Sequence, residues 1–271
     1  MDNNNYFVTK KPLDPFLSTL VDCYFYIDVP ASQLALSSEY IIPFPRITFG
    51  YFFDYPFTVT NLSLNQSVSV EMVISRISTQ KIVVQPQTDR IKIIGAHVRP
   101  FGLAYFTKTP IKSLPWLINT QDLFQLAATA FKEKIQHCTD TEQMFDEVEN
   151  IFLDHLLARD LSLITTAVEL MENNAATTEI KDLARQLNVS DRTLRNHFYD
   201  HIGCSPKEYL RLVKLKQAAS KMIHSGHALT RIAHESGFFD QAHFINDVKD
   251  ITGYSPNNLR KQIPHFRFLQ F

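Results

Sequence analysis

The pattern of apolar and polar positions changes near residue 116. Before it, short β-branched or aromatic runs are separated by Pro, Asn and Asp, which predicts strands joined by turns. Ten of the thirteen prolines fall within the first 115 residues, and none lies between Trp116 and Ser205. After residue 116 the apolar residues recur at helical spacing. The runs with strand character are 23–27, 46–52, 67–74, 81–84 and 90–95, and the helices predicted before the C-terminal region are 122–137, 141–158 and 161–172.

The helix predicted at 141–158 carries an apolar stripe opposite acidic residues. The stripe consists of Met144, Val148, Ile151 and Phe152. Such a helix either lies on its own barrel or forms the seam of a homodimer, and the spacing alone fits both.

Residues 179–256 contain a duplicated unit. Leu183-Ala184 recurs as Ile232-Ala233, and Gly203-Cys204-Ser205-Pro206 recurs as Gly253-Tyr254-Ser255-Pro256. The offset is 49 residues before the turn and 50 after it, so the second copy has one extra turn residue, which we assign to Phe239. A repeat of this period marks a duplicated supersecondary unit.

Each copy is predicted to be a helix, a tight turn and a second helix. Asn188 and Gly237 occupy the turns, where the chain needs a left-handed backbone conformation. Ser190 and Asp240 follow as N-caps of the second helices. This arrangement is a helix-turn-helix pair, whose second helix can enter the DNA major groove.

A helical spacer joins the two units. It begins with a Ser205 cap and Pro206, and it runs to about Ser225 before Gly226. At 1.5 Å per residue such a helix spans roughly 30 Å, and successive major grooves on one DNA face lie about 34 Å apart. The spacer therefore suits two recognition helices that enter adjacent grooves of one duplex.

The tandem units, the spacer and the sequence Ile-Ala-His-Glu-Ser-Gly-Phe at 232–238 resemble the DNA-binding domain of AraC/XylS-type transcription regulators. The resemblance covers roughly the last hundred residues, with Val248 and Asn188 in place of the family's usual aromatic residue and glycine. It implies a sequence-specific regulator with an N-terminal sensor or dimerisation domain. It also favours the stripe at 144–152 as a dimer seam.

Side chains suited to base reading lie on both second helices. Arginine suits guanine, and Asn or Gln suits adenine. In the first unit the candidates share one helix face at i, i+3 and i+4, and they match the family's base-contacting positions. The predicted base contacts are Arg192, Arg195 and Asn196 in the first unit and Gln241, His243 and Asn246 in the second.

The second unit is less basic than the first. Asp247 and Asp250 would repel phosphate if they faced the DNA. Phosphate contacts, which set the register without reading the sequence, are predicted for Ser190, Thr193 and Lys249.

Charge and composition agree with a DNA partner and point away from an enzyme. The net charge is −1, but residues from Ala175 onward carry 14 basic against 9 acidic side chains, and a basic half suits a polyanion. No phosphate loop, nucleophile elbow or paired-cysteine site occurs. His97 is the only histidine before residue 137, so a metal-dependent barrel enzyme has no ligand set. We therefore predict no metal and no cofactor.

The remaining expectations concern organisation and location. The class is α+β, with a cupin-like β-rich barrel or sandwich at 1–118, a helical dimerisation segment at 119–158 and the DNA-binding domain at 159–271. Three scattered cysteines and the lack of an 18-residue apolar run indicate the cytoplasm, alongside the bacterial nucleoid. The expected partners are double-stranded DNA, a second copy of the chain and RNA polymerase.

A ligand site in the N-terminal half is a further expectation. The segment 95–106 is interpreted either as a pocket wall, with Arg99 and Tyr105 as polar groups, or as a buried strand crossing. An effector would be a small organic molecule. The alternative to a regulator is a ligand-binding barrel whose helix-turn-helix domain serves protein interaction.

Overall fold

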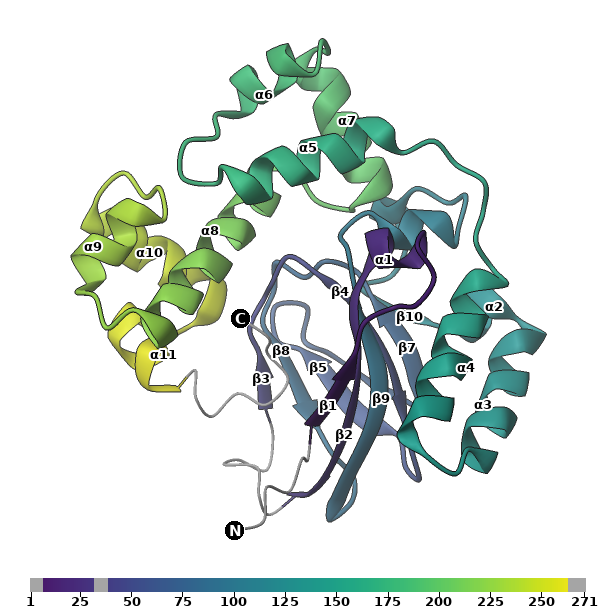
Figure 1. Ribbon diagram of the computed structural model, residues 1–271. Coiled ribbons are helices and arrows are strands. Elements are labelled where there is room, and N and C mark those ends of the chain that lie inside the picture. The colour runs from purple at the N-terminus through teal and green to yellow at the C-terminus, as the bar shows by residue number, and fades with distance from the viewer. Residues whose placement is uncertain (1–6, 32–38, 263–271) are drawn as a thin grey trace.

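Two antiparallel sheets form the N-terminal half and helices form the rest, which confirms the expected α+β class (Figure 1). The computed structural model describes residues 7–31 and 39–262. One sheet has the order β1 (Phe7–Lys10), β2 (Val21–Pro30), β9 (Arg90–Val98), β4 (Ile47–Phe52), β7 (Met72–Ser75) and β10 (Leu117–Asn119). The other has the order β3 (Glu39–Ile41), β8 (Ile82–Gln85), β5 (Phe57–Asn61) and β6 (Gln66–Val70).

The segment predicted as one strand at 67–74 is two strands. The chain passes from β6 in the smaller sheet to β7 in the larger one at Glu71. Buried side chains of both sheets, among them Phe52, Phe57 and Ile93, form a core cluster between the two layers. The alternation of apolar residues predicts an inward face for each strand, but it carries no signal for a change of sheet.

Three helices lie on the outer side of the larger sheet: α4 (Thr141–Leu153) packs on β2 and β9, α3 (Leu126–His137) packs on α4, and α2 (Gln121–Phe124) lies next to β10 (Figure 1). A short helix α1 (Leu17–Leu20) precedes β2. The helix predicted at 122–137 is broken at Gln125, whose φ is 48°. The helix predicted at 141–158 ends earlier, at Leu153.

The apolar stripe of α4 packs on the protein's own sheet. Met144, Val148, Ile151 and Phe152 are each at most 8% exposed. The Phe152 ring lies 5.3 Å from the ring of Phe49 on β4. These side chains therefore belong to the core of one chain, and the prediction that they form a dimer seam is wrong.

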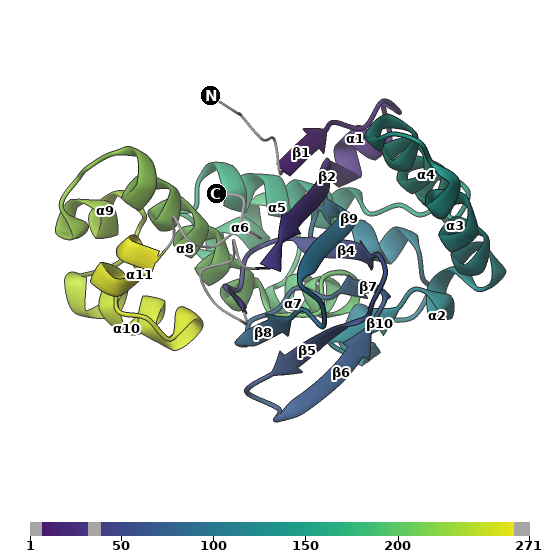
Figure 2. The same cartoon turned by 90° about the horizontal axis from the view of Figure 1, so that it is seen from below.

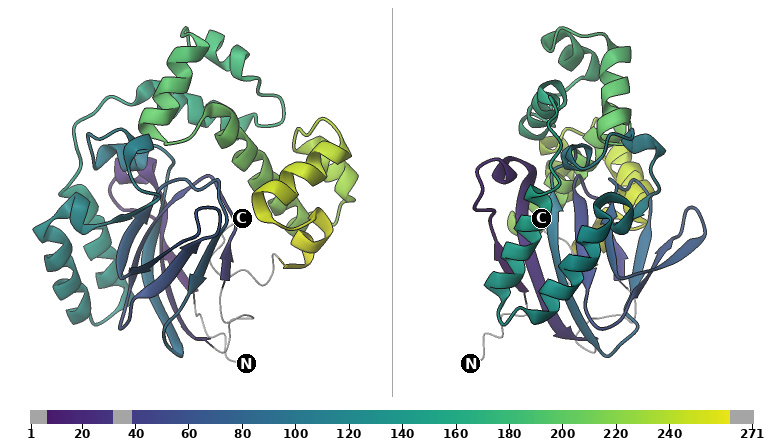
Figure 3. Two further views of the ribbon diagram at one scale, coloured as in Figure 1. Left: turned by 180° about the vertical axis from the view of Figure 1, so that it is seen from behind. Right: turned by 90° about the vertical axis from the view of Figure 1, so that its right-hand side faces the viewer.

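The C-terminal half contains two helical groups at the two ends of one long helix (Figures 1 and 2). Its helices are α5 (Ser162–Asn173), α6 (Ile180–Gln186), α7 (Asp191–His201), α8 (Pro206–His224), α9 (Leu229–Glu235), α10 (Gln241–Thr252) and α11 (Pro256–Gln262). Seen from behind, these helices arch over one end of the sheets (Figure 3). Within residues 7–31 and 39–262, no helix is long and apolar enough to cross a membrane.

Candidate nucleic-acid interface

The turn residues and the helix caps predicted for both helix-turn-helix units are confirmed. Asn188 and Gly237 have φ values of 55° and 76°, as the two turns require. The Ser190 and Asp240 side chains cap α7 and α10 by accepting hydrogen bonds from the third backbone N–H of each helix. The spacer α8 starts with a capping box between Ser205 and Glu208.

The first recognition helix, α7, has a buried face and an open polar face. Leu194 and Phe198 are fully buried. Arg192, Arg195 and Asn196 are exposed on the other side, and within the described part of the chain none of the three has an ion pair or a side-chain hydrogen bond. Their polar groups are therefore available to a ligand, although their contact with bases remains a prediction.

The predicted phosphate contacts differ in how free they are. The Ser190 hydroxyl accepts from the Thr193 backbone N–H at 3.0 Å, and the two hydroxyls lie 2.8 Å apart. Both side chains therefore take part in capping α7. Lys249 is exposed near the end of α10. Contact of Ser190, Thr193 and Lys249 with DNA phosphates remains a prediction.

The second recognition helix, α10, exposes Gln241, His243 and Asn246. His243 is held at both ring nitrogens, because Nδ1 accepts from the Phe239 backbone N–H at 3.4 Å and Nε2 lies 3.5 Å from the Asp247 carboxylate. These two contacts fix the orientation of the imidazole ring. Gln241 and Asn246 are free in the described part of the chain, whereas His243 has partners of its own.

The acidic residues of α10 are neutralised by the spacer. Arg211 of α8 contacts Asp247 at 3.0 and 3.2 Å and Asp250 at 2.8 Å. Asp247 is consequently only 16% exposed. The repulsion of phosphate that the sequence suggested is reduced because one guanidinium binds both carboxylates.

The spacer also holds the turn of the second unit. Lys214 donates to the Gly237 carbonyl at 2.8 Å, and Lys221 donates to the Glu235 carbonyl at 2.6 Å. Cations at the carbonyl end of a helix are favourable there. With Arg211, these contacts hold α9 and α10 against α8.

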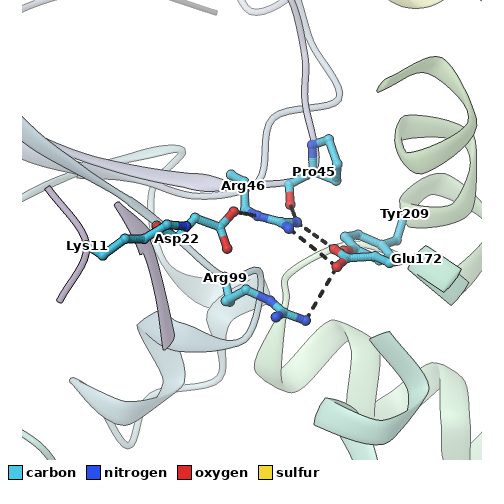
Figure 4. A network of polar contacts seen from close by, with 7 residues as sticks. All are labelled: Lys11, Asp22, Pro45, Arg46, Arg99, Glu172 and Tyr209. Atoms are coloured by element: carbon cyan, nitrogen blue, oxygen red, sulfur yellow. Dashed lines mark hydrogen bonds and ion pairs between the residues drawn. The ribbon is translucent and has the colours of Figure 1, made fainter. Parts of the chain in front are cut away.

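A polar network joins the DNA-binding helices to the sheets (Figure 4). Arg46, which is 8% exposed, binds Asp22 and donates to the Glu172 carboxylate at 2.5 Å. Glu172 also accepts from the Tyr209 hydroxyl at 2.6 Å and lies 3.4 Å from the Arg99 guanidinium. Two arginines of the β-domain therefore hold one carboxylate of α5, and through it the start of α8.

The surroundings of this network set its charge state. Burial alone would raise the pKa of Asp22, but the adjacent Arg46 guanidinium outweighs burial and lowers it. Burial and the nearby Glu172 carboxylate raise the pKa of Tyr209 well above its ordinary value. Tyr209 therefore remains a hydrogen-bond donor, and Asp22 remains ionised.

A cavity of about 130 Å³ lies between the two sheets. Its lining is mostly apolar, with Phe25, Phe52 and Ile93 among the contributors, and it includes Arg46 and His97. The Nδ1 atom of His97 has no hydrogen-bond partner, and burial lowers the pKa of His97 to about 4. The cavity lining thus includes a neutral imidazole whose Nδ1 atom is buried without a partner.

The two residues predicted as polar groups of a pocket do not line this cavity. Arg99 lies in the polar network instead, and Tyr105 packs edge-on against Phe16 with ring centroids 5.4 Å apart. Sequence reasoning missed Arg46, Glu172, Tyr209 and Arg211. Their side-chain partners lie 24 to 126 residues away, so no local pattern marks them. No group of His, Cys, Asp or Glu in the described ranges could hold a metal ion.

Two helix-turn-helix units on a common spacer, each with an exposed recognition helix, define a double-headed DNA-binding module. A protein family described as "Helix-turn-helix domain" matches residues 183–262. The C-terminal part of the chain is an AraC-type helix-turn-helix domain, and the resemblance to AraC/XylS-type regulators is confirmed there.

Curated relatives match the same segment. The HTH-type transcriptional activators RhaS of Salmonella arizonae and Salmonella newport are each 34% identical over 79 residues, which is 29% of this chain and 28% of each relative. The chain therefore matches only about a quarter of the length of these relatives. They are transcription regulators, and the prediction of a non-enzymatic protein is confirmed.

Solved structures share the fold of nearly the whole chain. ToxT from Vibrio cholerae O395 covers 98% of this chain with a TM-score of 0.53 at 10% identity, and all of the ToxT chain is matched. A ToxT from strain SCE256 with bound unsaturated fatty acid covers 96% of both chains with a TM-score of 0.51 at 12% identity. At this identity the likeness concerns the fold alone.

Proposed function

We propose that the protein is a sequence-specific transcription regulator that binds double-stranded DNA. The observation that carries the proposal is the exposed, unpaired set Arg192, Arg195 and Asn196 on α7, held by α8 to a second recognition helix. The named relatives are transcriptional activators, which supports activation with RNA polymerase as a partner. Such a protein works in the bacterial cytoplasm at the nucleoid.

Selection from a random duplex library tests this function. The full chain should enrich one sequence class, and a footprint should protect two groove segments one helical turn apart. A double variant, Arg192→Ala with Arg195→Ala, should lose the enrichment while its circular dichroism stays unchanged. Selection of no sequence class by the unmutated chain would overturn the proposal.

The cavity supports a small organic effector with an apolar body and an acidic group. ToxT has been solved with an unsaturated fatty acid and with (E)-4-(8-methylnaphthalen-1-yl)but-3-enoic acid, which are both apolar carboxylic acids. In this chain Arg46 and the unpartnered His97 lie in the lining of an otherwise apolar cavity. A cavity of about 130 Å³ is close to one that holds a benzene ring, at about 150 Å³, so the ligand should be compact.

Thermal denaturation with defined probes tests the effector class. Benzoic acid should raise the melting temperature, because a ligand that binds only the folded state stabilises it by RT ln(1 + [L]/Kd). The uncharged benzyl alcohol should act less strongly. Val59→Phe, which fills the cavity from β5, should abolish both effects. Equal stabilisation of the variant would refute binding in this cavity.

A homodimer also belongs to the proposal, through a surface other than the stripe of α4. Two copies would increase avidity by presenting two double-headed modules without any new DNA contact. Sedimentation of the full chain, with and without duplex, decides the stoichiometry. The alternative of a protein-interaction module predicts no duplex binding, and the unpaired arginines of α7 favour DNA.

A further inference from the structure

The turn of the second helix-turn-helix unit contains one residue more than the first. In both turns the backbone N–H of the second residue, Val189 or Phe238, donates to the equivalent Ala carbonyl. The cap of α7 follows Val189 directly, whereas Phe239 stands between Phe238 and the cap of α10. Phe239 is 91% exposed, more than any other large apolar side chain in the described part of the chain. The extra residue thus places an aromatic ring in solvent at the start of the recognition helix.

Two further apolar side chains continue from Phe239 along one face of α10. Ala242 and Ile245 follow at intervals of three residues, and both are exposed. Ala242 and Ile245 are three residues apart in α10 and therefore share a helix face. Phe239 lies two residues before the first residue of α10, next to the N-cap Asp240, so the three exposed apolar side chains lie along the N-terminal part of the helix and the turn before it. We call these three residues the apolar face of α10. It differs from the open side of α7, which carries two arginines and an asparagine.

The polar neighbours of this face do not change its character. Arg211 draws Asp247 and Asp250 toward α8. His243 is bonded to the Phe239 backbone and faces Asp247. Gln241 and Asn246 flank the apolar face as polar side chains without a partner among the described residues, and Lys249 is exposed further along α10.

We propose that the apolar face of α10 reads the C5-methyl groups of thymine in the major groove, with Phe239 as its main contact. Among the bases of the major groove only thymine presents a methyl group, and apolar side chains recognise it. The N-terminal residues of a recognition helix contact the base edges, and Phe239 lies there. The inference rests on the proposed DNA binding, and it makes the second unit thymine-specific while the first unit reads hydrogen-bonding groups.

Replacement of thymine by deoxyuridine tests this inference, because it removes only the methyl group. In the duplex selected by the full chain, each deoxyuridine under the second unit should weaken binding about fourfold, which corresponds to about 0.8 kcal/mol for one buried carbon. Under the first unit the same replacement should have little effect. Phe239→Ala should bind the thymine duplex more weakly and should no longer distinguish it from the deoxyuridine duplex. Phe239→Leu should keep part of this preference for thymine.

Leu126→Ala is the matched control, since Leu126 is another exposed apolar side chain, at 85%, but lies at the start of α3. This variant should bind both duplexes like the unmutated chain. The inference is overturned if the unmutated chain binds deoxyuridine and thymine duplexes equally, or if Phe239→Ala keeps the full penalty. A Phe239→Ala variant that changes only self-association or polymerase binding would also overturn it. If no duplex is selected at all, the proposed function itself fails.

Discussion

Arg46 and Glu172 are 126 residues apart in the chain, yet the Arg46 guanidinium donates to the Glu172 carboxylate at 2.5 Å. Arg46 immediately precedes β4, and Glu172 lies near the end of α5. The pair therefore joins the β-domain directly to the first helix of the DNA-binding half. Arg46 also lines the cavity, so one residue lies at both the proposed effector site and the DNA-binding helices.

Glu172→Gln should loosen this junction. The amide retains the shape of the carboxylate but leaves the buried Arg46 with Asp22 as its only anionic partner. Removing one partner of a buried pair typically costs about 3–5 kcal/mol, and we expect a smaller loss because Asp22 remains. Denaturant unfolding measures the loss, and limited proteolysis around residues 154–161 measures the opening. Glu169→Gln, at an exposed position of the same helix, should change neither.

Arg195→Ala tests base reading by α7. The variant should lose about 1–3 kcal/mol of specific binding and relax the preference at one base pair. Lys249→Ala should instead weaken all sequences alike and reduce the salt slope by about one unit. Binding titrations at several salt concentrations, on selected and scrambled duplexes, separate the two effects. An unchanged base preference in Arg195→Ala would show that α7 is not the reading helix.

Gly237→Ala should push the turn of the second helix-turn-helix unit away from Ala176, which lies between α5 and α6. A Cβ at Gly237 would lie 2.3 Å from the Ala176 Cα, and the φ of 76° disfavours any side chain. Gly226→Ala is the control, because its φ is 62° but no atom lies within 4 Å of the added Cβ. The left-handed conformation costs about 1–2 kcal/mol at either site. Thermal unfolding should therefore show the larger loss for Gly237→Ala.

The buried His97 makes stability depend on pH. Burial lowers the pKa of His97 in the folded protein to about 4, whereas the unfolded chain binds the proton near pH 6.5. Between these values the unfolded state binds more protons, so stability falls as the pH falls from about 6.5 to about 4, by up to roughly 3 kcal/mol. Urea unfolding across this range measures the slope. His97→Gln should remove this part of it, and an unchanged slope would assign it to other groups.

Ile151→Asp separates core from interface at α4. Ile151 is 5% exposed and packs with the chain's own sheet. An unpaired charge placed there should destabilise the monomer by several kcal/mol, and circular dichroism should show lost structure. A folded variant with a reduced sedimentation coefficient would restore the dimer interpretation.

Sequence reasoning succeeded where the determining interactions are local. The caps Ser190, Ser205 and Asp240 and the turn residues Asn188 and Gly237 act within a few residues of themselves, so their chemistry is visible in the chain. The duplicated order of these signals then specified two helix-turn-helix units. The extra turn residue Phe239 was visible for the same reason.

The remaining features depend on contacts between distant segments. The stripe on α4 predicted a buried face, but helical spacing is the same whether the covering surface is the chain's own sheet or a second copy. Arg99 was predicted as a polar group of a pocket wall, but it lies 3.4 Å from Glu172, which belongs to the helical half of the chain. Arg211 looked like one more basic residue of a spacer, because Asp247 and Asp250 come close only after α10 folds back onto α8.

The helix α8 contacts three parts of the molecule that lie far apart in the sequence: α5, the cavity wall and α9. Tyr209 near its start binds Glu172, Lys216 near its middle lies 5.7 Å from the Phe44 ring in the cavity wall, and Lys221 near its end holds α9. A helix of 19 residues is about 28 Å long, so it behaves as a lever. A tilt of about 5° at its start would move the far end by about 2.5 Å over that length, enough to shift a base contact out of hydrogen-bonding range. A small rearrangement of the cavity wall would therefore reach the DNA as a change in the distance between two groove contacts.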